Sequence, residues 1–351
     1  MNAPVSFTTL AVREAEPADA ERIAAFVAAH PDGTPFHLAQ WSAAVARGCG
    51  QRAHVLLAER ADGDIAGVLP LTFVRSPMFG KALVSAGFGV AGGVLAHDPA
   101  TVRCLADGAW ALARRLGCPG VELRGGPCPG PGWHSDADTY LGFARDLAAD
   151  DEAELLAIPR KQRAEVRKAL ANDLDVTVDR DLRAHYAVYS ASVRNLGTPV
   201  FPRALFRAAL DAFGDDADIL TVRYDGVAVA SVLSLYWRGT VYPYWGGGTE
   251  AARGLRANDM MYFALMRHAR GRGCTRFDFG RSKAGTGPAA FKKNWGFEPA
   301  PLVYHHRSAD GAAPRTINPL DPRYAAKIAA WKRLPLPVAN LIGPFIARGL
   351  G

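Results

Sequence analysis

The sequence has few cysteines and no pattern that would use them. The five in its 351 residues are odd in number and include no C-x-x-C pair: Cys49, Cys104, Cys118, Cys128 and Cys274. This spacing predicts neither a disulfide framework nor a zinc site, and it fits a reducing compartment. We therefore expect no bound metal.

Long apolar runs and a leader are lacking as well. No run approaches the about 18 uncharged apolar residues that a membrane-spanning helix needs. Residues 1–11 contain no basic region followed by an apolar core, so we expect no signal peptide. These absences predict a cytoplasmic protein, with the inner face of a membrane as a second possible place of action.

The remaining composition is that of an ordinary globular protein, with 49% hydrophobic and 21% charged residues. The length favours two domains. The formal net charge of +7 permits anionic partners such as nucleotides, phosphates, RNA or a membrane surface. Arginine-rich codon usage would explain the same charge. A DNA partner is not expected.

The two halves of the chain repeat one order of predicted elements: a β-hairpin, a glycine-rich segment, a helix, and a strand with one acid between apolar residues. The hairpins turn at Asp62-Gly63 and Asp225-Gly226, because glycine accepts the positive φ that such turns need. The segments are 55–59, 65–74, 87–93, 99–116 and 121–123 in the first half, and 220–224, 227–237, 244–249, 258–270 and 277–279 in the second. The order predicts two α/β domains, each with a mixed, mainly antiparallel sheet flanked by helices.

The predicted domains are residues 1–150 and 151–315, with the active site in the second. Their junction follows the Pro/Gly-rich stretch 125–132. The tail, 316–351, is apolar and basic and contains prolines that break any long helix. Two outcomes are open for it, packing back on the body or peripheral attachment to a membrane.

The most informative motif is Phe277-Asp278-Phe279-Gly280-Arg281-Ser282-Lys283, followed by Phe291-Lys292-Lys293-Asn294-Trp295-Gly296-Phe297. It reads as a buried strand that ends in a glycine turn with two cations, then a short helical turn with two lysines. Such an arrangement suits an anionic or carbonyl-bearing group at the end of a sheet.

These motifs resemble the FemAB-like proteins, N-acyltransferases built from two acetyltransferase (GNAT)-type domains. Residues 163–174, 192–197, 277–283 and 291–296 look similar to that family. Residues 194–201 and 294–297 are especially similar to the FemAB-related proteins of PEP-CTERM/exosortase and exopolysaccharide systems. The resemblance covers most of the second domain, and the first domain only by its plan.

The resemblance implies transfer of an acyl or aminoacyl group to an amine of a peptidoglycan-type, cell-envelope or exopolysaccharide precursor. The donor would be aminoacyl-tRNA or acyl-CoA, with no tightly bound cofactor. The long helical arm of classical members has no place in this sequence, which argues against their kind of tRNA recognition. Residues 251–257 keep one glycine of the loop that holds the pyrophosphate of CoA, and Arg256 stands where a small residue is expected. This argues against CoA binding.

The resemblance also implies site residues. Lys292 follows the aromatic of the Phe-Lys-x-x-x-Gly motif, so its ammonium would stabilise the oxyanion of a tetrahedral intermediate. Asp278 would orient the acceptor amine or accept its proton, or else pair with Arg276 or Arg281. Substrate binding is expected at Arg194, Asn195, Tyr244, Trp245, Arg281, Lys283 and Lys293, and donor binding at Gly246, Gly247, Gly248 and Asn258.

Several of these residues could instead have a purely structural role. The three glycines could form a bulge or tight turn, and Arg194 and Asn195 could simply lie at a helix end closed by Gly197. Tyr244 and Trp245 could belong to the core. Two other functions are also open, an acyl-CoA acetyltransferase with a degenerate loop and a non-catalytic glycan-binding protein.

Overall fold

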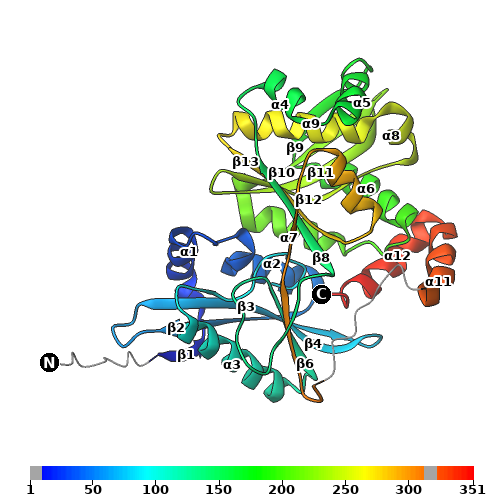
Figure 1. Ribbon diagram of the computed structural model, residues 1–351. Coiled ribbons are helices and arrows are strands. Elements are labelled where there is room, and N and C mark those ends of the chain that lie inside the picture. The colour runs from blue at the N-terminus through cyan, green and yellow to red at the C-terminus, as the bar shows by residue number, and fades with distance from the viewer. Residues whose placement is uncertain (1–9, 312–321) are drawn as a thin grey trace. The chain divides into compact units, whose positions relative to one another are not determined.

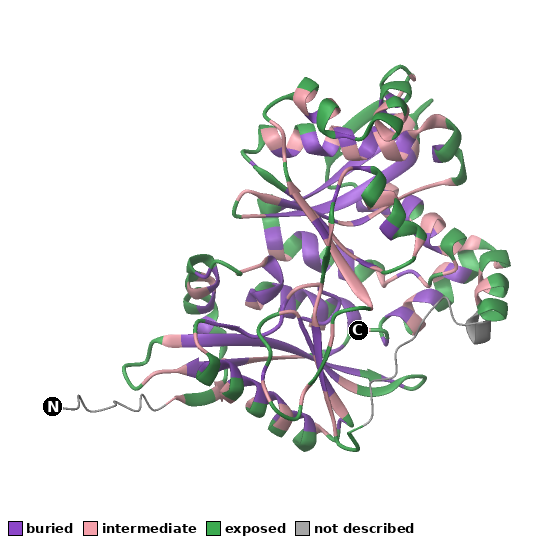
Figure 2. Cartoon of the chain, viewed as in Figure 1, coloured by how far each residue is buried: buried purple, intermediate pink, exposed green. Residues whose placement is uncertain are grey.

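Two separate sheets organise the chain. The computed structural model describes residues 10–311 and 322–351 (Figure 1). The first unit comprises Met1–Ala137, Val303–Arg315 and Gly349–Gly351, and the second Asp138–Leu302 and Thr316–Arg348. The central strands of both sheets are largely buried (Figure 2).

The first unit has an eight-stranded sheet in the order β1-β2-β3-β4-β6-β15-β7, with β5 paired to β3. The strands are β1 (Ala11–Glu14), β2 (Arg52–Glu59), β3 (Ile65–Ser76), β4 (Gly80–Ser85), β5 (Leu95–Ala96), β6 (Gly120–Arg124), β7 (His134–Asp136) and β15 (Tyr304–Ser308). The helices are α1 (Ala20–Ala29), α2 (Ala39–Cys49) and α3 (Pro99–Leu116). Helix α3 begins where Asp98 accepts hydrogen bonds from the amides of Ala100 and Thr101, and ends at Gly117 with φ 66°.

The second unit has a seven-stranded sheet in the order β14-β8-β13-β12-β11-β10-β9. Its strands are β8 (Tyr140–Asp146), β9 (Asp175–Asp179), β10 (Ala217–Tyr224), β11 (Val227–Trp237), β12 (Thr240–Gly248), β13 (Arg276–Lys283) and β14 (Pro299–Pro301). The predicted hairpin β10–β11 turns at Asp225 and Gly226, both with positive φ. The predicted fold, two α/β domains with mixed sheets flanked by helices, is confirmed.

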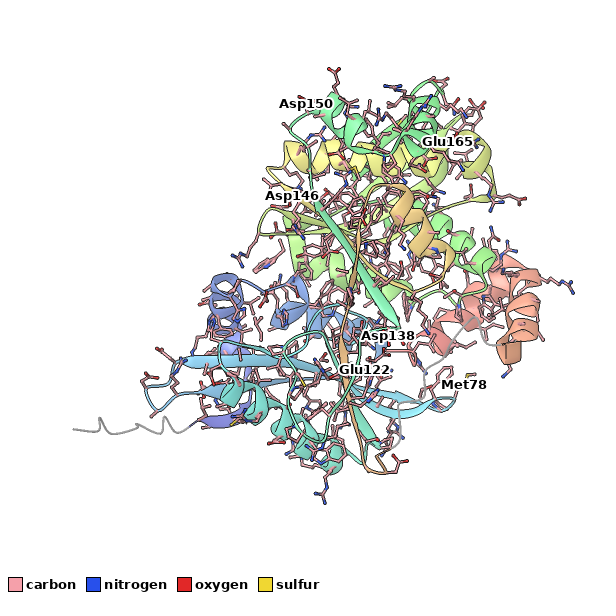
Figure 3. All side chains as sticks on the ribbon, in the orientation of Figure 1. Met78, Glu122, Asp138, Asp146, Asp150 and Glu165 are labelled. Atoms are coloured by element: carbon pink, nitrogen blue, oxygen red, sulfur yellow. The ribbon has the colours of Figure 1, made fainter. Side chains whose placement is uncertain are left out.

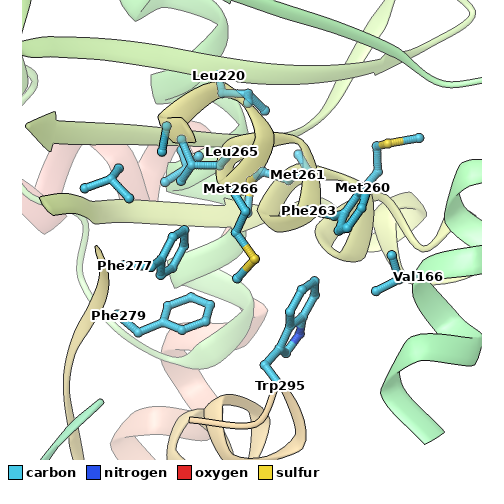
Figure 4. Packing of buried hydrophobic residues seen from close by; sticks show 14 of the residues in the cluster. Val166, Leu220, Met260, Met261, Phe263, Leu265, Met266, Phe277, Phe279 and Trp295 are labelled. Atoms are coloured by element: carbon cyan, nitrogen blue, oxygen red, sulfur yellow. The ribbon is translucent and has the colours of Figure 1, made fainter. Parts of the chain in front are cut away.

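Helices cover both faces of this second sheet. They are α4 (Asp151–Ala157), α5 (Arg160–Leu170), α6 (Leu182–Leu196), α7 (Arg203–Phe213), α8 (Glu250–Leu255), α9 (Ala257–Gly271), α10 (Gly287–Asn294), α11 (Pro322–Arg333) and α12 (Leu336–Ala347). Helix α6 approaches β12 from one face at Gly247, and α9 approaches from the other at Gly246. On the α9 face, Phe277, Phe279 and Trp295 pack with Met266 in the core (Figure 4).

The division of the chain differs from the predicted boundaries at 150 and 315. Strand β8 pairs with β13 and β14, so residues 138–150 belong to the second unit. Strand β15 pairs with β6 and β7, so residues 303–315 belong to the first. Each sheet therefore includes one strand from the other predicted domain, because hydrogen bonding between strands that are distant in sequence determines to which sheet a strand belongs.

The tail packs back on the body through α6, which is one of its two expected outcomes. The amide of Asn340 donates to Ser190 Oγ at 3.2 Å, and Gly343 lies against Val200. Gly197, at the end of α6, lies against Ile328. Among the described residues, no helix is long and apolar enough to cross a membrane.

Candidate active site

The parallel strands β12 and β13 separate soon after they meet. Their ladder pairs Thr240 with Arg276 and Val241 with Phe277 within the described residues. Beyond that point β12 stays paired with β11, and β13 with β8. The carboxyl ends of two parallel strands thus diverge, which is the kind of place where α/β sheets bind ligands. Asp278 is the first residue of β13 past the last pair.

Strand β13 bulges at this opening, and Lys292 holds the bulge. The register against β8 shifts between Asp278 and Arg281. From α10, the ammonium of Lys292 donates to the carbonyl oxygens of Phe279, Gly280 and Arg281 at 2.6, 3.2 and 2.9 Å. An ammonium has three protons, so β13 accepts all of them. Burial lowers the pKa of Lys292 to about 7, although the charge of Asp278 opposes the shift.

Asp278 is half-buried and keeps one oxygen for other partners. Its Oδ1 accepts the amide proton of Gly280 at 2.7 Å. Burial raises the pKa of Asp278, while the Gly280 amide and the charges of Lys292 and Arg276 oppose the rise. Arg276 pairs instead with Asp146 at 3.0 Å, and no ion pair to Asp278 occurs in the described part of the chain. A carboxylate with a raised pKa is suited to accept a proton.

Tyr242, on β12, is a neighbour of Asp278 that the sequence did not reveal. Burial and the charge of Asp278 both raise the pKa of this phenol. Tyr242 and Asp278 are each the first residue after the last pair between β12 and β13, so they face each other where the strands begin to diverge. The signal was absent from the sequence because it depends on where the two strands separate.

The cations of β13 lie together past Asp278. The guanidinium carbon of Arg281 lies 4.6 Å from the ring centre of Tyr140, and the Lys283 ammonium lies 5.6 Å from it. The structure thus brings these two expected substrate-binding residues onto one aromatic ring. Lys293 is exposed on α10.

The aromatic pair on β12 divides between the core and a bulge. The register against β11 places Pro243 opposite Ser234 and Trp245 opposite Leu233, so Tyr244 is the extra residue. Trp245 is buried against Phe206 of α7, with ring centres 4.8 Å apart. Trp245 was expected to bind substrate, but it belongs to the hydrophobic core, which was the alternative interpretation. Tyr244 is half-buried and packs edge-on to Trp245 at 4.9 Å.

The three glycines form no loop. Gly246, Gly247 and Gly248 continue β12 and pair with Val232, Ser231 and Ala230 of β11. A Cβ on Gly247 would overlap Ser192 of α6, and one on Gly248 would lie 2.6 Å from Asn258 Oδ1. Close helix packing on both faces of the strand therefore requires these glycines. A loop of free amides facing an anion, as expected from the sequence, is not formed.

Asn258 lies in the first turn of α9 but is not its N-cap. That position belongs to Arg256, which has left-handed backbone angles (φ 57°, ψ 27°). Residues 250–255, which overlap the stretch 251–257 expected as a loop, form helix α8. The guanidinium of Arg256 bonds to Glu165 of α5, which Figure 3 labels, and to the carbonyl of Arg253.

Arg194 and Asn195 lie at the end of α6, beside the tail. The Arg194 guanidinium donates to the carbonyl oxygen of Lys332 at 3.1 Å, and Asn195 is exposed. Gly197 closes the helix with φ 84°. These contacts match the helix-end alternative, and neither residue contacts Asp278 or Lys292 within the described residues.

At the corresponding opening of the first unit, the described residues offer no comparable free acid. Its strands β4 and β6 are also parallel and pair only Leu83 with Val121 and Val84 with Glu122 among the described residues. Here Glu122 forms an ion pair with Arg124 at 2.6 Å, and Ser85 Oγ accepts the Arg124 amide at 2.7 Å. The acid is neutralised, so the second unit is the better candidate for chemistry.

A cavity of about 1010 Å³ in the second unit lies away from Asp278. Its lining includes Leu170, Val176, Met260, Phe263 and His268, from α5, β9 and α9. None of the proposed site residues lines it, so we assign the site by the strand opening and not by the cavity.

Comparisons with known proteins bear on the fold and on the class of activity. Residues 160–293 match a family model described as an acetyltransferase (GNAT) domain. The structure is similar to that of FemX, with a TM-score of 0.66 and 16% sequence identity over 84% of this chain and 96% of that chain. The chain has the tandem GNAT fold. Acyl transfer is the activity that the family match supports.

Two further solved structures share the fold. One is a tandem GNAT protein from the clavulanic acid biosynthesis pathway, with a TM-score of 0.57 and 14% identity over 88% of this chain and 100% of that chain. The other is the C-terminal domain of a putative lysylphosphatidylglycerol synthetase from Agrobacterium fabrum, with a TM-score of 0.57 and 14% identity over 84% of this chain and 93% of that chain. No curated protein matches the sequence.

Proposed function

We propose that the second unit catalyses acyl transfer to an amine, with Asp278 as the general base. The observation that carries the proposal is a half-buried carboxylate with a raised pKa at the point where β12 and β13 separate. The amine nitrogen forms a bond to the donor's carbonyl carbon, and Asp278 takes the proton that the nitrogen loses. The bond from that carbon to the donor's sulfur or oxygen then breaks, and the leaving group is released.

Lys292 serves as a positioning residue in this proposal. Its ammonium donates to three carbonyls of the β13 bulge and so fixes Asp278 and Arg281 on either side of that bulge. Arg281 and Lys283 would bind an anionic part of the donor or acceptor, because both cations lie at the end of the same strand.

The donor remains one of two classes, aminoacyl-tRNA or an acyl-CoA thioester. Arg256 argues against CoA, because it stands at the start of α9 where a small residue would let a pyrophosphate reach the backbone, and Glu165 and the carbonyl of Arg253 hold its guanidinium there. The acetyltransferase description of the matched family favours CoA. We propose aminoacyl transfer as the first candidate, and CoA-dependent acetylation as the second.

The proposed acceptor is an amine of a cell-envelope, peptidoglycan-type or exopolysaccharide precursor, used at the inner face of a membrane. The support is the motif resemblance at residues 194–201 and 294–297 to FemAB-related proteins of PEP-CTERM/exosortase systems. A protein that only binds a glycan would need no base at the strand opening.

The first measurement is calorimetric titration of the purified chain with acetyl-CoA and with a longer acyl-CoA. Micromolar binding would establish the thioester donor. If no heat is detected, charged tRNA is the donor to test next, in a transfer assay with amine acceptors.

The decisive variant is Asp278→Asn, with Asp146→Asn as its matched control. Asp146 lies in the same unit, and its side chain is 82% exposed. We expect transfer to fall by about 10²–10⁴-fold in Asp278→Asn and to stay unchanged in the control. Full activity of a folded Asp278→Asn protein would refute the proposal.

A further inference from the structure

Helix α12 turns its large side chains outward and its small ones inward. Val338, Leu341, Ile342 and Phe345 are 40%, 72%, 40% and 60% exposed. They are spaced i, i+3, i+4 and i+7, so they form one continuous apolar stripe. Ala339, Gly343 and Ala347 are the buried residues of this helix.

This arrangement is the reverse of a helix that stabilises its own fold. Buried alanine and glycine remove little apolar surface from water and so stabilise the fold only slightly. Each large apolar side chain that stays in water contributes none of the stabilisation that its burial would give. Leu196 adds a further 64% exposed side chain at the end of α6, next to the Gly197 that packs on α11. An apolar surface of this kind marks a site of association.

The charges of the two tail helices are of one sign. Residues 322–351 contain no acidic residue. Lys327, Lys332 and Arg333 are exposed on α11, and Arg348 is exposed directly after α12, 5.1 Å from the ring centre of Phe345. The exposed stripe and these cations point to a partner that is apolar and anionic together.

We propose that α11 and α12 attach the protein to an anionic lipid surface. A helix of 12 residues is roughly 18 Å long, too short for the about 30 Å hydrocarbon core, so α12 would lie in the plane of the interface. The stripe would enter the acyl boundary, and the cations would contact the anionic headgroups. This inference does not depend on the proposed acyl transfer, since no site residue at the strand opening takes part.

The test is flotation of the full chain with vesicles of phosphatidylcholine alone, or of phosphatidylcholine mixed equally with phosphatidylglycerol. We expect binding to the mixed vesicles and little to the neutral ones. Leu341→Ser with Phe345→Ser should lower partitioning by about a hundredfold, because two exposed apolar side chains no longer enter the bilayer. Lys332→Glu with Arg333→Glu should abolish the preference for the anionic vesicles.

The matched control is Leu156→Ser with Val227→Ser, which removes two apolar side chains of similar exposure, 58% and 64%, outside α11 and α12. It should bind vesicles as the unchanged chain does. The substituted positions are all exposed, so a thermal melt confirms that each variant is folded. Equal binding of the Leu341/Phe345 variant, or an equal loss in the control, would overturn the proposal.

Light scattering after gel filtration tests the competing occupant, a second copy of the chain. If the unchanged chain is a dimer that Leu341→Ser and Phe345→Ser convert to a monomer, and vesicle binding is absent, the stripe is a subunit interface and the lipid proposal is wrong. A monomer that binds vesicles supports it.

Discussion

Replacing Lys292 by methionine tests whether this residue positions β13 or acts on the substrate. The change keeps an unbranched side chain of similar size and removes the ammonium that three carbonyl oxygens accept from. A net hydrogen bond contributes about 1 kcal/mol, and one to a charged group about 1.5–3 kcal/mol. Burial of the charge offsets part of that gain, because it lowers the pKa of Lys292 to about 7. We therefore expect Lys292→Met to lower the free energy of unfolding by about 3 kcal/mol.

Urea unfolding and a thermal melt measure this loss, which corresponds to a melting temperature lower by roughly 6–12 °C. Lys293→Met is the control, since Lys293 is exposed on the same helix and should change stability by less than about 0.5 kcal/mol. If Lys292→Met melts like the unchanged chain but has lost acyl transfer, the ammonium acts on the substrate and the positioning role is refuted.

The same residue predicts a pH dependence. The folded-state pKa of Lys292, about 7, is below its ordinary value of 10.5, so the unfolded chain binds more protons between these two values. Stability contributed by this group must then rise with pH through that window. The stability difference between the unchanged chain and Lys292→Met should widen from pH 7 towards pH 10.5. A constant difference would show that the carbonyls keep the ammonium protonated.

Three further predictions concern the second unit. The pKa of Asp278 in the folded chain is raised above its ordinary value of 3.8, so the stability contributed by this group falls as pH rises from 3.8 through the raised pKa. Asp278→Asn should therefore be more stable than the unchanged chain at pH 7 and equally stable at pH 3. Urea unfolding at the two pH values measures this difference. Gly247→Ala should cost about 1–3 kcal/mol because its Cβ overlaps Ser192, and adding Ser192→Gly should restore part of that stability in a double-mutant cycle. A fragment of residues 138–348 should unfold cooperatively in a circular-dichroism melt, whereas 151–348, which lacks β8, should not; equal melts would contradict the strand assignment.

The elements that the sequence predicted well are those with local signals. The helix at 99–116 has the predicted bounds, since Asp98 caps its start and Gly117 its end. The hairpin at Asp225-Gly226 forms because both residues take positive φ, as the turn requires. Alternation, caps and turn residues act within a few positions, so one chain is enough to reveal them.

Residues whose role depends on distant neighbours could not be placed in this way. Gly246, Gly247 and Gly248 look like a loop because glycine weakens strands, but the approach of α6 and α9 outweighs that tendency. Trp245 looks like a binding residue until Phe206 of α7 is known to cover it. Lys292 was predicted as a site residue, but its three carbonyl acceptors were not, because they come together only where β13 bulges against β8.

The exchange of strands explains why the boundary was the hardest feature to predict. Local sequence assigns a strand to the nearest preceding domain, and β8 and β15 follow one sheet in sequence while they pair in the other. In the second sheet β8 lies between β13 and β14 and supplies the partner against which β13 bulges. The geometry around Asp278 therefore depends on residues 140–146, which sequence reasoning placed in the other domain. To locate a candidate site in a tandem fold of this kind, the order of the strands in each sheet must be known, because the residues that form the site come from both halves of the chain.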